Sequence, residues 1–484
     1  MISNMNIYAR IFLLTLISIV SISATNAQSR LLKGTVTESS TGKGIQGVSV
    51  TDGFSVVNTD AGGVYSFYPH PEAQFVYISI PAGFSIPTEK FLPKFYQQLS
   101  RAKTRYNFQL VKEATDDSRH VLIVGADPQP ANEEASQKWL HFARNYFKPV
   151  TERYADLSKI GILCGDIVGD DLSLYANHKE AIASMRFPVF QVAGNHDNNY
   201  EARSDDGSVR TFRETFGPEY YSFNKGRIHY VVLDNVFYLG KEASYLGYLS
   251  ERQLNWLEND LKLVPAGTTV IVSAHMPFEV DNRKPQESDP LGMPGSNVIT
   301  NLSHFYKLLA PYTVHLMSGH THWHQQFEKN GIFHHIHGAI CGAWWGGNTS
   351  FDGTPLGFAV YEIDGDSLSW YYQSAGHDRD HQMQLTYVDS SSTVIANVWD
   401  WDDKWKVELI ADGKDMGGMM RYIGYSPVMS DYYNSLPPGS PWMKPVLTGH
   451  LFKMRVPAGT ARITVKVTDR FGRIYKESMA INNK

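Results

Sequence analysis

Cysteine is nearly absent from the sequence, since only Cys164 and Cys341 occur among 484 residues. Two thiols exclude a small fold stapled by several disulfides. Cys164 ends an apolar run and Cys341 stands in a Gly-rich stretch, so we expect both to be small buried hydrophobes. One disulfide between them is the alternative, but a sequence does not give the distance that such a bond requires.

An excess of positive charge is also missing. Lys and Arg number 44 against 49 Asp and Glu, which gives a net charge of −5, and no block rich in Lys or Arg occurs. Proteins that bind a nucleic-acid backbone need clustered cations, so we expect no nucleic-acid partner. The apolar share of 42% and the charged share of 19% are typical of a globular protein and argue against long disorder.

Long apolar runs are absent except near the N-terminus. The run at 11–20 is shorter than the roughly 20 residues that span a bilayer. An arginine precedes it, and the small residues Thr25 and Ala27 suit cleavage before Gln28. We therefore expect residues 1–27 to be a signal peptide, the mature protein to be periplasmic or extracellular, and no transmembrane segment to remain. A retained membrane anchor is the alternative.

Short runs of β-branched and aromatic residues mark both ends of the remaining chain. Near the N-terminus they are separated by Gly, Asp and Ser turns, for example around 47–50, which predicts a β-sandwich over residues 28–115. Towards the C-terminus, apolar and polar residues alternate at 397–401 and 462–468. This alternation predicts a second all-β sandwich over residues 379–484.

The N-terminal pattern Gly47-Val-x-Val, followed by Thr59-Asp-x-x-Gly63-x-Tyr65, resembles carboxypeptidase-regulatory-like modules. That resemblance implies a β-sandwich fold and little about function. We expect this region to act as a structural spacer.

The middle of the chain, residues 116–378, alternates strand and helix patterns. Continuous apolar runs at 120–124 and 269–273 are typical of buried strands. From 132 onward, apolar residues recur at helical spacing after a polar and acidic start. The alternation predicts an α/β domain with layered sheets.

Five short segments of this middle region end apolar runs with residue types that ligate metals. Strand ends are where α/β sheets hold ligands and catalytic groups. Oxygens from Asp and Asn, mixed with imidazole, suit Mn, Fe or Zn better than a metal that prefers thiolate. The segments are Ala126-Asp-Pro-Gln129, Gly165-Asp166, Gly194-Asn-His-Asp197, Ser273-Ala-His275 and Gly319-His-Thr-His322.

In this order, the five segments resemble those of the calcineurin-like metallophosphoesterase superfamily, in its secreted bacterial type with a β module on each side of the core. The resemblance covers about residues 117–375 and implies a four-layer αββα core. It also implies an enzyme that hydrolyses phosphate monoesters or diesters by in-line attack of a metal-bridging hydroxide, with two divalent ions as cofactors. The alternatives are a nucleotide pyrophosphatase and a non-catalytic secreted binding protein that uses its β modules.

The resemblance also implies a role for each site residue. His196 is expected to protonate the leaving oxygen, and the neighbouring carboxylate of Asp197 to raise the pKa of His196 toward that role. The expected metal ligands are Asp127 and His322 for one ion, Asn195, His275 and His320 for the other, and Asp166 between the two.

Gln129 departs from the pattern of many family members, which carry histidine at this place; a subgroup with Asp-Pro-Gln resembles this chain more closely. A Gln amide oxygen is a neutral and weaker donor than imidazole. We expect Gln129 either to ligate the first metal or to leave it an extra water, and metal binding there to be weaker or more selective.

Several neighbouring residues are candidates for substrate contact. The Gly-rich segment 341–347 carries Trp344 and Trp345, which either stack on a base or sugar or pack the core against the C-terminal region. Asn198 follows the histidine segment closely enough to reach substrate. Asp170 and Asp171 are expected to begin a helix, with a supporting role behind the site as the alternative.

Overall fold

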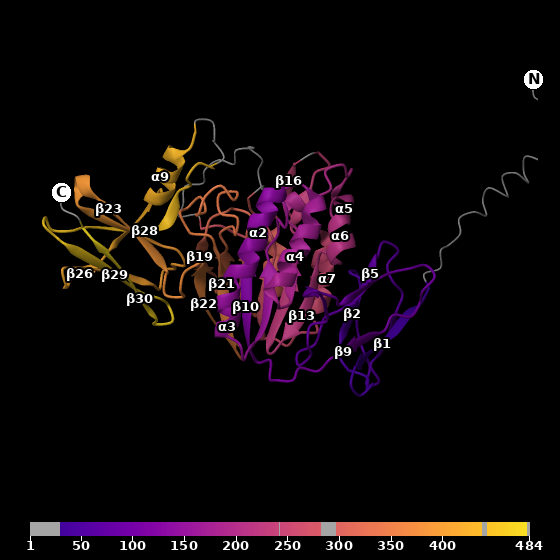
Figure 1. Cartoon of the computed structure of the whole chain (residues 1–484). Helices are drawn as coiled ribbons and strands as arrows, with labels where there is room; N and C mark the ends of the chain where they lie inside the picture. The colour runs from indigo at the N-terminus through magenta and orange to yellow at the C-terminus, as the bar shows by residue number, and fades with distance from the viewer. Residues whose placement is uncertain (1–29, 242, 282–296, 438–442, 482–484) are drawn as a thin grey trace, which may run out of the picture.

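The computed structural model describes residues 30–241, 243–281, 297–437 and 443–481, so the predicted signal peptide lies outside the described residues. Figure 1 shows three regions in a row: a β-rich N-terminal region, an α/β core in the middle and a β-rich C-terminal region. None of the helices described is long and apolar enough to cross a membrane.

Two mixed sheets form the core, with strand orders β12-β11-β10-β21-β22 and β13-β14-β17-β18-β20-β19. The strands that precede the site segments run parallel within each sheet, so their carboxyl ends meet at one edge, toward the top of Figure 1. The first sheet consists of β10 (Arg119–Gly125), β11 (Ser158–Leu163), β12 (Val189–Gln191), β21 (Gly357–Asp364) and β22 (Ser367–Ser374). The second consists of β13 (Tyr221–Lys225), β14 (Ile228–Val232), β17 (Thr269–Ser273), β18 (Thr313–Ser318), β19 (Gln325–Lys329) and β20 (Ile332–Ile336).

Helices cover the outer face of each sheet, which confirms the predicted four-layer αββα arrangement. Val121 of the first sheet packs in one hydrophobic cluster with Trp139 of α2. Val270 of the second sheet packs in another with Trp256 of α7 and Phe305 of α8. The helices are α2 (Glu133–Tyr146), α3 (Lys148–Arg153), α4 (Tyr175–Met185), α5 (Asp205–Ser208), α6 (Arg210–Phe216), α7 (Glu251–Leu261) and α8 (Leu302–Leu309), and a hairpin of β15 (Val236–Tyr238) and β16 (Tyr245–Gly247) lies beside them.

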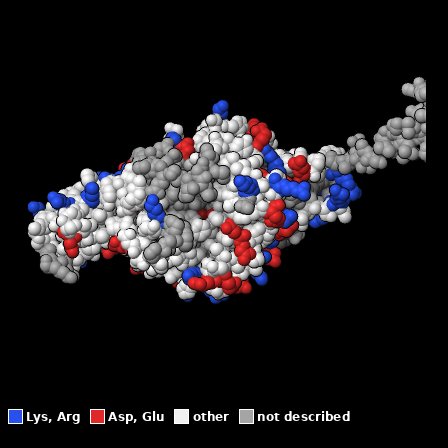
Figure 2. Space-filling view, turned by 90° about the horizontal axis from the view of Figure 1, so that it is seen from above, with Lys and Arg blue, Asp and Glu red and all other residues white. Residues whose placement is uncertain are grey.

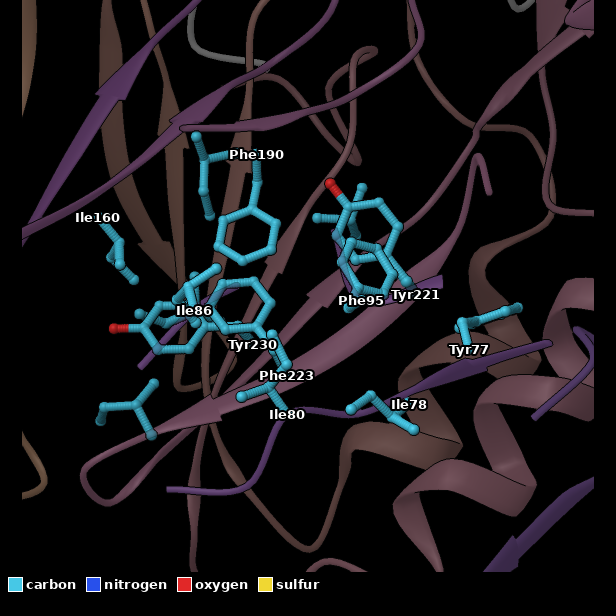
Figure 3. Packing of buried hydrophobic residues seen from close by; sticks show 14 of the residues in the cluster. Tyr77, Ile78, Ile80, Ile86, Phe95, Ile160, Phe190, Tyr221, Phe223 and Tyr230 are labelled. Carbon is cyan, nitrogen blue, oxygen red and sulfur yellow. The ribbon is translucent and has the colours of Figure 1, made fainter. Parts of the chain in front are cut away.

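An aromatic cluster joins the two sheets and reaches into the N-terminal region (Figure 3). Phe190 stacks on Phe223 with 3.9 Å between ring centroids, and Phe223 stacks on Tyr230 at 4.7 Å. Ile80 and Phe95 from the N-terminal region belong to the same cluster, and Ile80 forms a β-bridge with Phe223. The N-terminal region therefore shares the hydrophobic interior of the core.

Two small sheets, with orders β4-β1-β9 and β3-β2-β5-β8, make up most of the N-terminal region. Their inward residues alternate with exposed ones, as the sequence pattern predicts; β1, for example, buries Leu32 and Val36. The strands are β1 (Leu32–Glu38), β2 (Ser49–Thr51), β3 (Val56–Asn58), β4 (Val64–Phe67), β5 (Phe75–Ile78), β8 (Tyr96–Gln98) and β9 (Phe108–Leu110), with a separate pair β6 (Thr88–Glu89) and β7 (Leu92–Pro93).

In the described part of the C-terminal region, two four-stranded antiparallel sheets pack together with one α-helix. The sequence pattern predicts a strand through residue 401, but β24 ends at Val398, because Asp400 turns into the core and accepts a hydrogen bond from His324 at 2.9 Å. The elements are β23 (Met383–Val388), β24 (Thr393–Val398), β25 (Lys406–Ala411), β26 (Lys414–Gly418), β27 (Met420–Gly424), α9 (Pro427–Ser435), β28 (Thr448–Arg455), β29 (Arg462–Thr468) and β30 (Ile474–Ala480).

A buried polar cluster binds this C-terminal region to the core. Asp352 of the core accepts hydrogen bonds from His450 Nε2 at 3.1 Å and from the backbone N–H of His324 at 2.7 Å. The side-chain amide of Asn397 donates to the carbonyl of Asp352 at 3.1 Å. The buried side chain of Asp352 therefore belongs to the contact between the two regions.

Both acidic and basic side chains occur on the face seen in Figure 2, and several basic ones gather at the end formed by the N-terminal region. The absence of a nucleic-acid partner stays a prediction, because one face does not describe the whole surface.

A fully buried histidine, His178, ties α4 to its neighbours. Its Nδ1 accepts a hydrogen bond from the indole of Trp139 on α2 at 3.1 Å, and its Nε2 donates to the side-chain oxygen of Gln191 on β12 at 2.9 Å. These partners require a neutral ring, since protonated Nδ1 would face an N–H donor. Burial lowers the pKa of His178 to about 4, against a smaller opposing effect of Gln191.

This lowered pKa predicts a loss of stability in acid. Between pH 6.5 and about 4, the unfolded chain takes up a proton at His178 that the folded chain refuses, so the free energy of unfolding falls as pH falls, by at most about 1.4 kcal/mol per pH unit for this group. In His178→Leu, stability at pH 7.5 is expected to drop and its dependence on pH to become shallower in this window. Urea unfolding followed by fluorescence measures both, with His141→Leu, an exposed position on α2, as control. Parallel curves for wild type and His178→Leu would contradict the assignment.

Candidate metal centre

The five predicted segments follow the carboxyl ends of five strands, three in the first sheet and two in the second. Asp127, Asp166 and Asn195 come after β10, β11 and β12, whereas His275 follows β17 and His320 follows β18. The site therefore spans the edges of both sheets, which the inter-sheet packing holds together. Four of these side chains are buried, and His320 is partly exposed.

Potential ligand atoms form two groups that share one carboxylate. Asp127, Asp166 and His322 offer atoms within 4.8 Å of one another, as do Asp166, His275 and His320. Asn195 joins the second group, because its Oδ1 lies 2.9 Å from His275 Nε2. Each group has the mixture of carboxylate and imidazole ligands that divalent transition metals accept.

Backbone carbonyls orient two of the histidines. His275 Nδ1 donates to the carbonyl of Cys164 at 2.8 Å, and His322 Nδ1 donates to the carbonyl of Gly342 at 3.2 Å. In both rings Nε2 is then directed into the site, the tautomer that a metal-binding histidine needs. The two cysteines are free and buried, which confirms the expected role of small hydrophobes.

Two oxygen atoms lie close to His275 Nε2, and no Lys or Arg side chain of the described chain pairs with the carboxylates of the site. Asn195 Oδ1 lies at 2.9 Å and Asp166 Oδ1 at 3.3 Å from His275 Nε2. Within the described chain, Asp127 and Asp166 form ion pairs only with histidines. Two buried carboxylates with no Lys or Arg beside them are costly unless protonated histidine or a bound cation supplies positive charge. The residues present therefore fit a cation.

The pKa values show how strongly these carboxylates favour positive charge. Burial alone would lower the pKa of His275, but the carboxylates of Asp166 and Asp127 outweigh burial and raise it to about 9. Burial raises the pKa of Asp127 well above its ordinary value, and the charge of Asp166 adds to that effect. A divalent ion would satisfy both carboxylates at once.

Backbone strain is concentrated at the site. Non-glycine residues rarely adopt the left-handed region, and such strain persists only where the surroundings impose it. Gly165 and Gly319 allow close approach beside these residues: a Cβ on Gly165 would lie 2.3 Å from the His275 ring, and one on Gly319 would lie 2.5 Å from Asp127 Oδ2. The site residues with positive φ are Asp127, Gln129, Asp166, Asp170, His320, His322, Trp344 and Trp345.

Gln129 is buried beside the first group. Its amide nitrogen donates to Asp166 Oδ2 at 3.2 Å, while its oxygen lies 3.9 Å from the sulfur of Cys341. In this orientation Gln129 is a hydrogen-bond partner of the shared carboxylate of Asp166. A 180° rotation of the amide would instead direct the Gln129 oxygen toward the ligand group. Both predicted roles of Gln129 stay open.

His196 is paired with Asp170 and not with the adjacent Asp197. His196 Nδ1 donates to Asp170 Oδ1 at 2.6 Å, and the hydroxyl of Tyr200 donates to the same oxygen at 2.6 Å. Burial would lower the pKa of His196, but Asp166 and Asp170 raise it to about 9. Asp170 and Asp171 were both expected to begin a helix. Asp171 does so, by accepting from the backbone N–H of Ser173 at 3.0 Å, whereas Asp170 pairs with His196.

Asp197, expected as a partner of His196, braces the backbone of the site. Its carboxylate accepts hydrogen bonds from the N–H groups of Gly194 at 2.8 Å and Ile167 at 3.1 Å, and from the hydroxyl of Tyr175 at 3.0 Å. The expectation that Asp197 raises the pKa of His196 is therefore corrected, because its oxygens point to the β11 and β12 loops. Sequence proximity gave no signal for Asp170, which lies 26 residues away from His196.

The three candidate substrate residues differ in exposure. Trp345 is only 9% exposed and its indole donates to the carbonyl of Pro128 at 2.8 Å, so it packs in the core instead of facing substrate. Trp344 is 36% exposed and lies against His196 and His322. Asn198 is 2% exposed, and both polar atoms of its side chain are without a hydrogen-bond partner in the described chain.

The fold and the site together define an α/β protein with a metal-ligand cluster at the edge of two packed sheets. Three family models match the chain: the N terminal of calcineurin-like phosphoesterase at residues 30–113, calcineurin-like phosphoesterase at 132–324, and the C terminal of calcineurin-like phosphoesterase at 334–475. The chain belongs to the calcineurin-like phosphoesterases, with the N-terminal, core and C-terminal regions of that family. Membership in an Asp-Pro-Gln subgroup stays a prediction.

Individual relatives are more distant. The 3',5'-cyclic adenosine monophosphate phosphodiesterase CpdA of Escherichia coli (strain K12) is 28% identical over 178 residues, which are 35% of this chain and 56% of the relative. The chain thus spans about half the length of the curated relatives it matches. Among solved structures, purple acid phosphatase PPD1 from yellow lupin (Lupinus luteus) has 13% identity and a TM-score of 0.39, covering 69% of this chain and 68% of that one. A 5'-nucleotidase from Candida albicans SC5314 has 13% identity and a TM-score of 0.31, covering 53% and 51%.

Replacing Gln129 by His tests the first ligand group. An imidazole in place of the amide is expected to tighten binding of one ion per chain by roughly tenfold, because a stronger donor would then face the shared carboxylate. Titration calorimetry with Mn²⁺ and Zn²⁺, together with elemental analysis, measures affinity and stoichiometry. Equal values for the variant and wild type would show that Gln129 has no influence on the metal.

Replacing Asp170 by Asn tests its pairing with His196. If Asp170 holds the ring as a proton donor, kcat for an ester with an alkyl leaving group is expected to fall by about 10²-fold. A p-nitrophenyl ester needs little protonation of its leaving oxygen, so its kcat should fall much less. Asp171→Asn, one residue away and outside the site, serves as control. Equal losses on both esters would instead indicate a purely structural role for Asp170.

Proposed function

We propose that the protein is a metal-dependent hydrolase of phosphate monoesters or diesters with a dinuclear centre. The observation that carries this proposal is the pair of ligand groups sharing Asp166. A shared carboxylate is the usual bridge between two cations about 3.5–4 Å apart, which is the arrangement of two-metal phosphoesterases.

The proposed ligands follow from the two groups. Asp127, Asp166 and His322 would hold one ion, with Gln129 beside them, and the shared Asp166 together with three further residues would hold the second. When bound, two such ions would supply Lewis-acid stabilisation of the reacting phosphate and a nucleophile available at neutral pH. The proposed ligands of the second ion are Asp166, Asn195, His275 and His320.

The side chains around the centre would protonate the leaving oxygen and hold the ligand loops in position. His196, held at Nδ1 by Asp170, would give the proton at its other nitrogen to the leaving oxygen as the P–O bond breaks. Asp197 would keep the loops after β11 and β12 in register through its three hydrogen bonds. The near-complete burial of the ligands limits access of bulk water, which strengthens every electrostatic interaction within the site.

The substrate proposal rests on the family and on its relatives. Phosphodiesters are included because a CpdA relative is a cyclic-nucleotide phosphodiesterase by name, and monoesters because the ligand set fits either class. We further propose that the protein works outside the cytoplasm, as residues 1–27 suggest from sequence. A nucleotide pyrophosphatase would use the same centre. A non-catalytic binding protein would have little need for the buried ligand set.

Removing the shared carboxylate is the most direct test. In Asp166→Asn, bound metal is expected to fall and hydrolysis of p-nitrophenyl phosphate and its bis-ester to be lost, as a chelator should also achieve in wild type. Asp156→Asn removes an exposed carboxylate just before β11 and should retain both metal and turnover. Cyclic AMP and a nucleotide pyrophosphate are assayed in parallel. A wild-type protein that holds two ions yet cleaves none of these esters would contradict the proposed function.

A further inference from the structure

One exposed tryptophan borders the proposed metal centre. The Trp344 ring lies 5.8 Å from the His196 ring at an interplanar angle of 82°, and 5.1 Å from the His322 ring at 36°. It is 36% exposed, although large aromatic residues elsewhere in the core are mostly buried. The ring therefore contacts one proposed metal ligand and the proposed proton donor while one part of it faces outward.

The backbone holds Trp344 in this place against its conformational preference. Trp344 and Trp345 have φ values of 55° and 59°, in the left-handed region that bulky residues avoid. Strain of this kind clusters at binding and catalytic sites, where the surroundings over-determine it. Here Trp345 fixes the loop from the inside, because its indole donates to the Pro128 carbonyl and its ring packs edge-on to Phe142 at 6.2 Å.

The C-terminal region holds the same loop from the outside. The hydroxyl of Tyr432 on α9 donates to the carbonyl of Gly346. A Cβ on Gly347 would lie 2.9 Å from the Tyr432 ring, so glycine lets α9 approach closely. Thr349 donates to the sulfur of Met429 at 3.5 Å. The loop is thus held between the core and α9, and the side chain of Trp344 faces outward from it.

We propose that Trp344 is a specificity-determining residue that stacks on a flat ring in the leaving group, so that the protein prefers phosphate esters of aryl, arylmethyl or nucleoside alcohols over esters of saturated ones. This inference rests on the proposed function. Since His196 gives its proton to the leaving oxygen, the group attached to that oxygen is the part of the substrate that lies beside Trp344. An indole face is a stacking platform for any planar ring.

A second ring borders the other side of the centre. Tyr245 on β16 lies 5.8 Å from the His320 ring at an interplanar angle of 80°. It contacts the second ligand group, whereas Trp344 contacts the first group and His196. This arrangement assigns the leaving group to Trp344 and leaves the rest of a diester to the Tyr245 side.

A matched pair of esters isolates the effect of a flat ring. Benzyl and cyclohexylmethyl phosphate have leaving alcohols of similar size and basicity, and differ in whether the ring is planar. Each is supplied as a monoester and as a methyl diester, and kcat and KM are measured from the release of alcohol. Wild type is expected to favour the benzyl ester by about fivefold to tenfold in kcat/KM.

Three variants complete the test. Trp344→Leu should bring the ratio of benzyl to cyclohexylmethyl turnover close to one, mainly by raising KM for the benzyl ester, and Trp344→Phe should keep part of the preference. Tyr68→Leu removes an exposed aromatic of the N-terminal region and should leave the ratio unchanged. Metal content is measured for each variant to exclude an indirect loss.

The outcomes separate this inference from the proposed function. A wild-type ratio near one, or an unchanged ratio in Trp344→Leu, would overturn the role of Trp344 while hydrolysis itself stands. If p-nitrophenyl esters and both test esters are all left intact by the metal-loaded protein, the proposed function fails and the role of Trp344 fails with it.

Discussion

The burial of Asp127 and Asp166 side by side is the constraint on which the rest of the structure depends. Neither carboxylate meets a Lys or Arg in the described chain, and histidine nitrogens are their only ion-pair partners. Such a pair is unstable in a protein interior unless a cation compensates for it. The two carboxylates therefore need positive charge, which either protonated histidine or a bound ion can supply, and the stability of the empty and loaded forms should differ accordingly.

The sheets and loops around this pair fix the positions of the ligand side chains. Three parallel strands of one sheet and two of the other deliver the ligands, and the aromatic stack of Phe190, Phe223 and Tyr230 fixes the two sheets against each other. Carbonyl oxygens aim the imidazoles, and Asp197 ties the loops between strands. Each of these contacts is weak by itself, but together they restrict the rotamers and loop positions of the ligand side chains before a metal binds.

The sequence predicts the three-region layout of strands and helices, the αββα core and the ligand candidates at strand ends, because these depend on local periodicity and on the rule that parallel strands end together. What it fails to predict depends on the direction of a side chain in space. The partner of His196 is Asp170, 26 residues away, whereas the adjacent Asp197 points to the backbone. Trp344 and Trp345 are consecutive in one loop, yet Trp344 is exposed and Trp345 is buried. The hydrogen bond from the Trp345 indole to the Pro128 carbonyl, which the sequence does not predict, accounts for this difference. The early end of β24 follows from the contact of Asp400 with His324.

The polar cluster formed by His324, Asp352, Asn397 and His450 has a consequence for how such chains diverge. His324 lies two residues beyond His322, so a change in the C-terminal region reaches a ligand through one short segment, with no flexible connection to absorb it. The core and the C-terminal region therefore complete each other's hydrogen bonds, and removing one region would leave buried polar atoms of the other without partners.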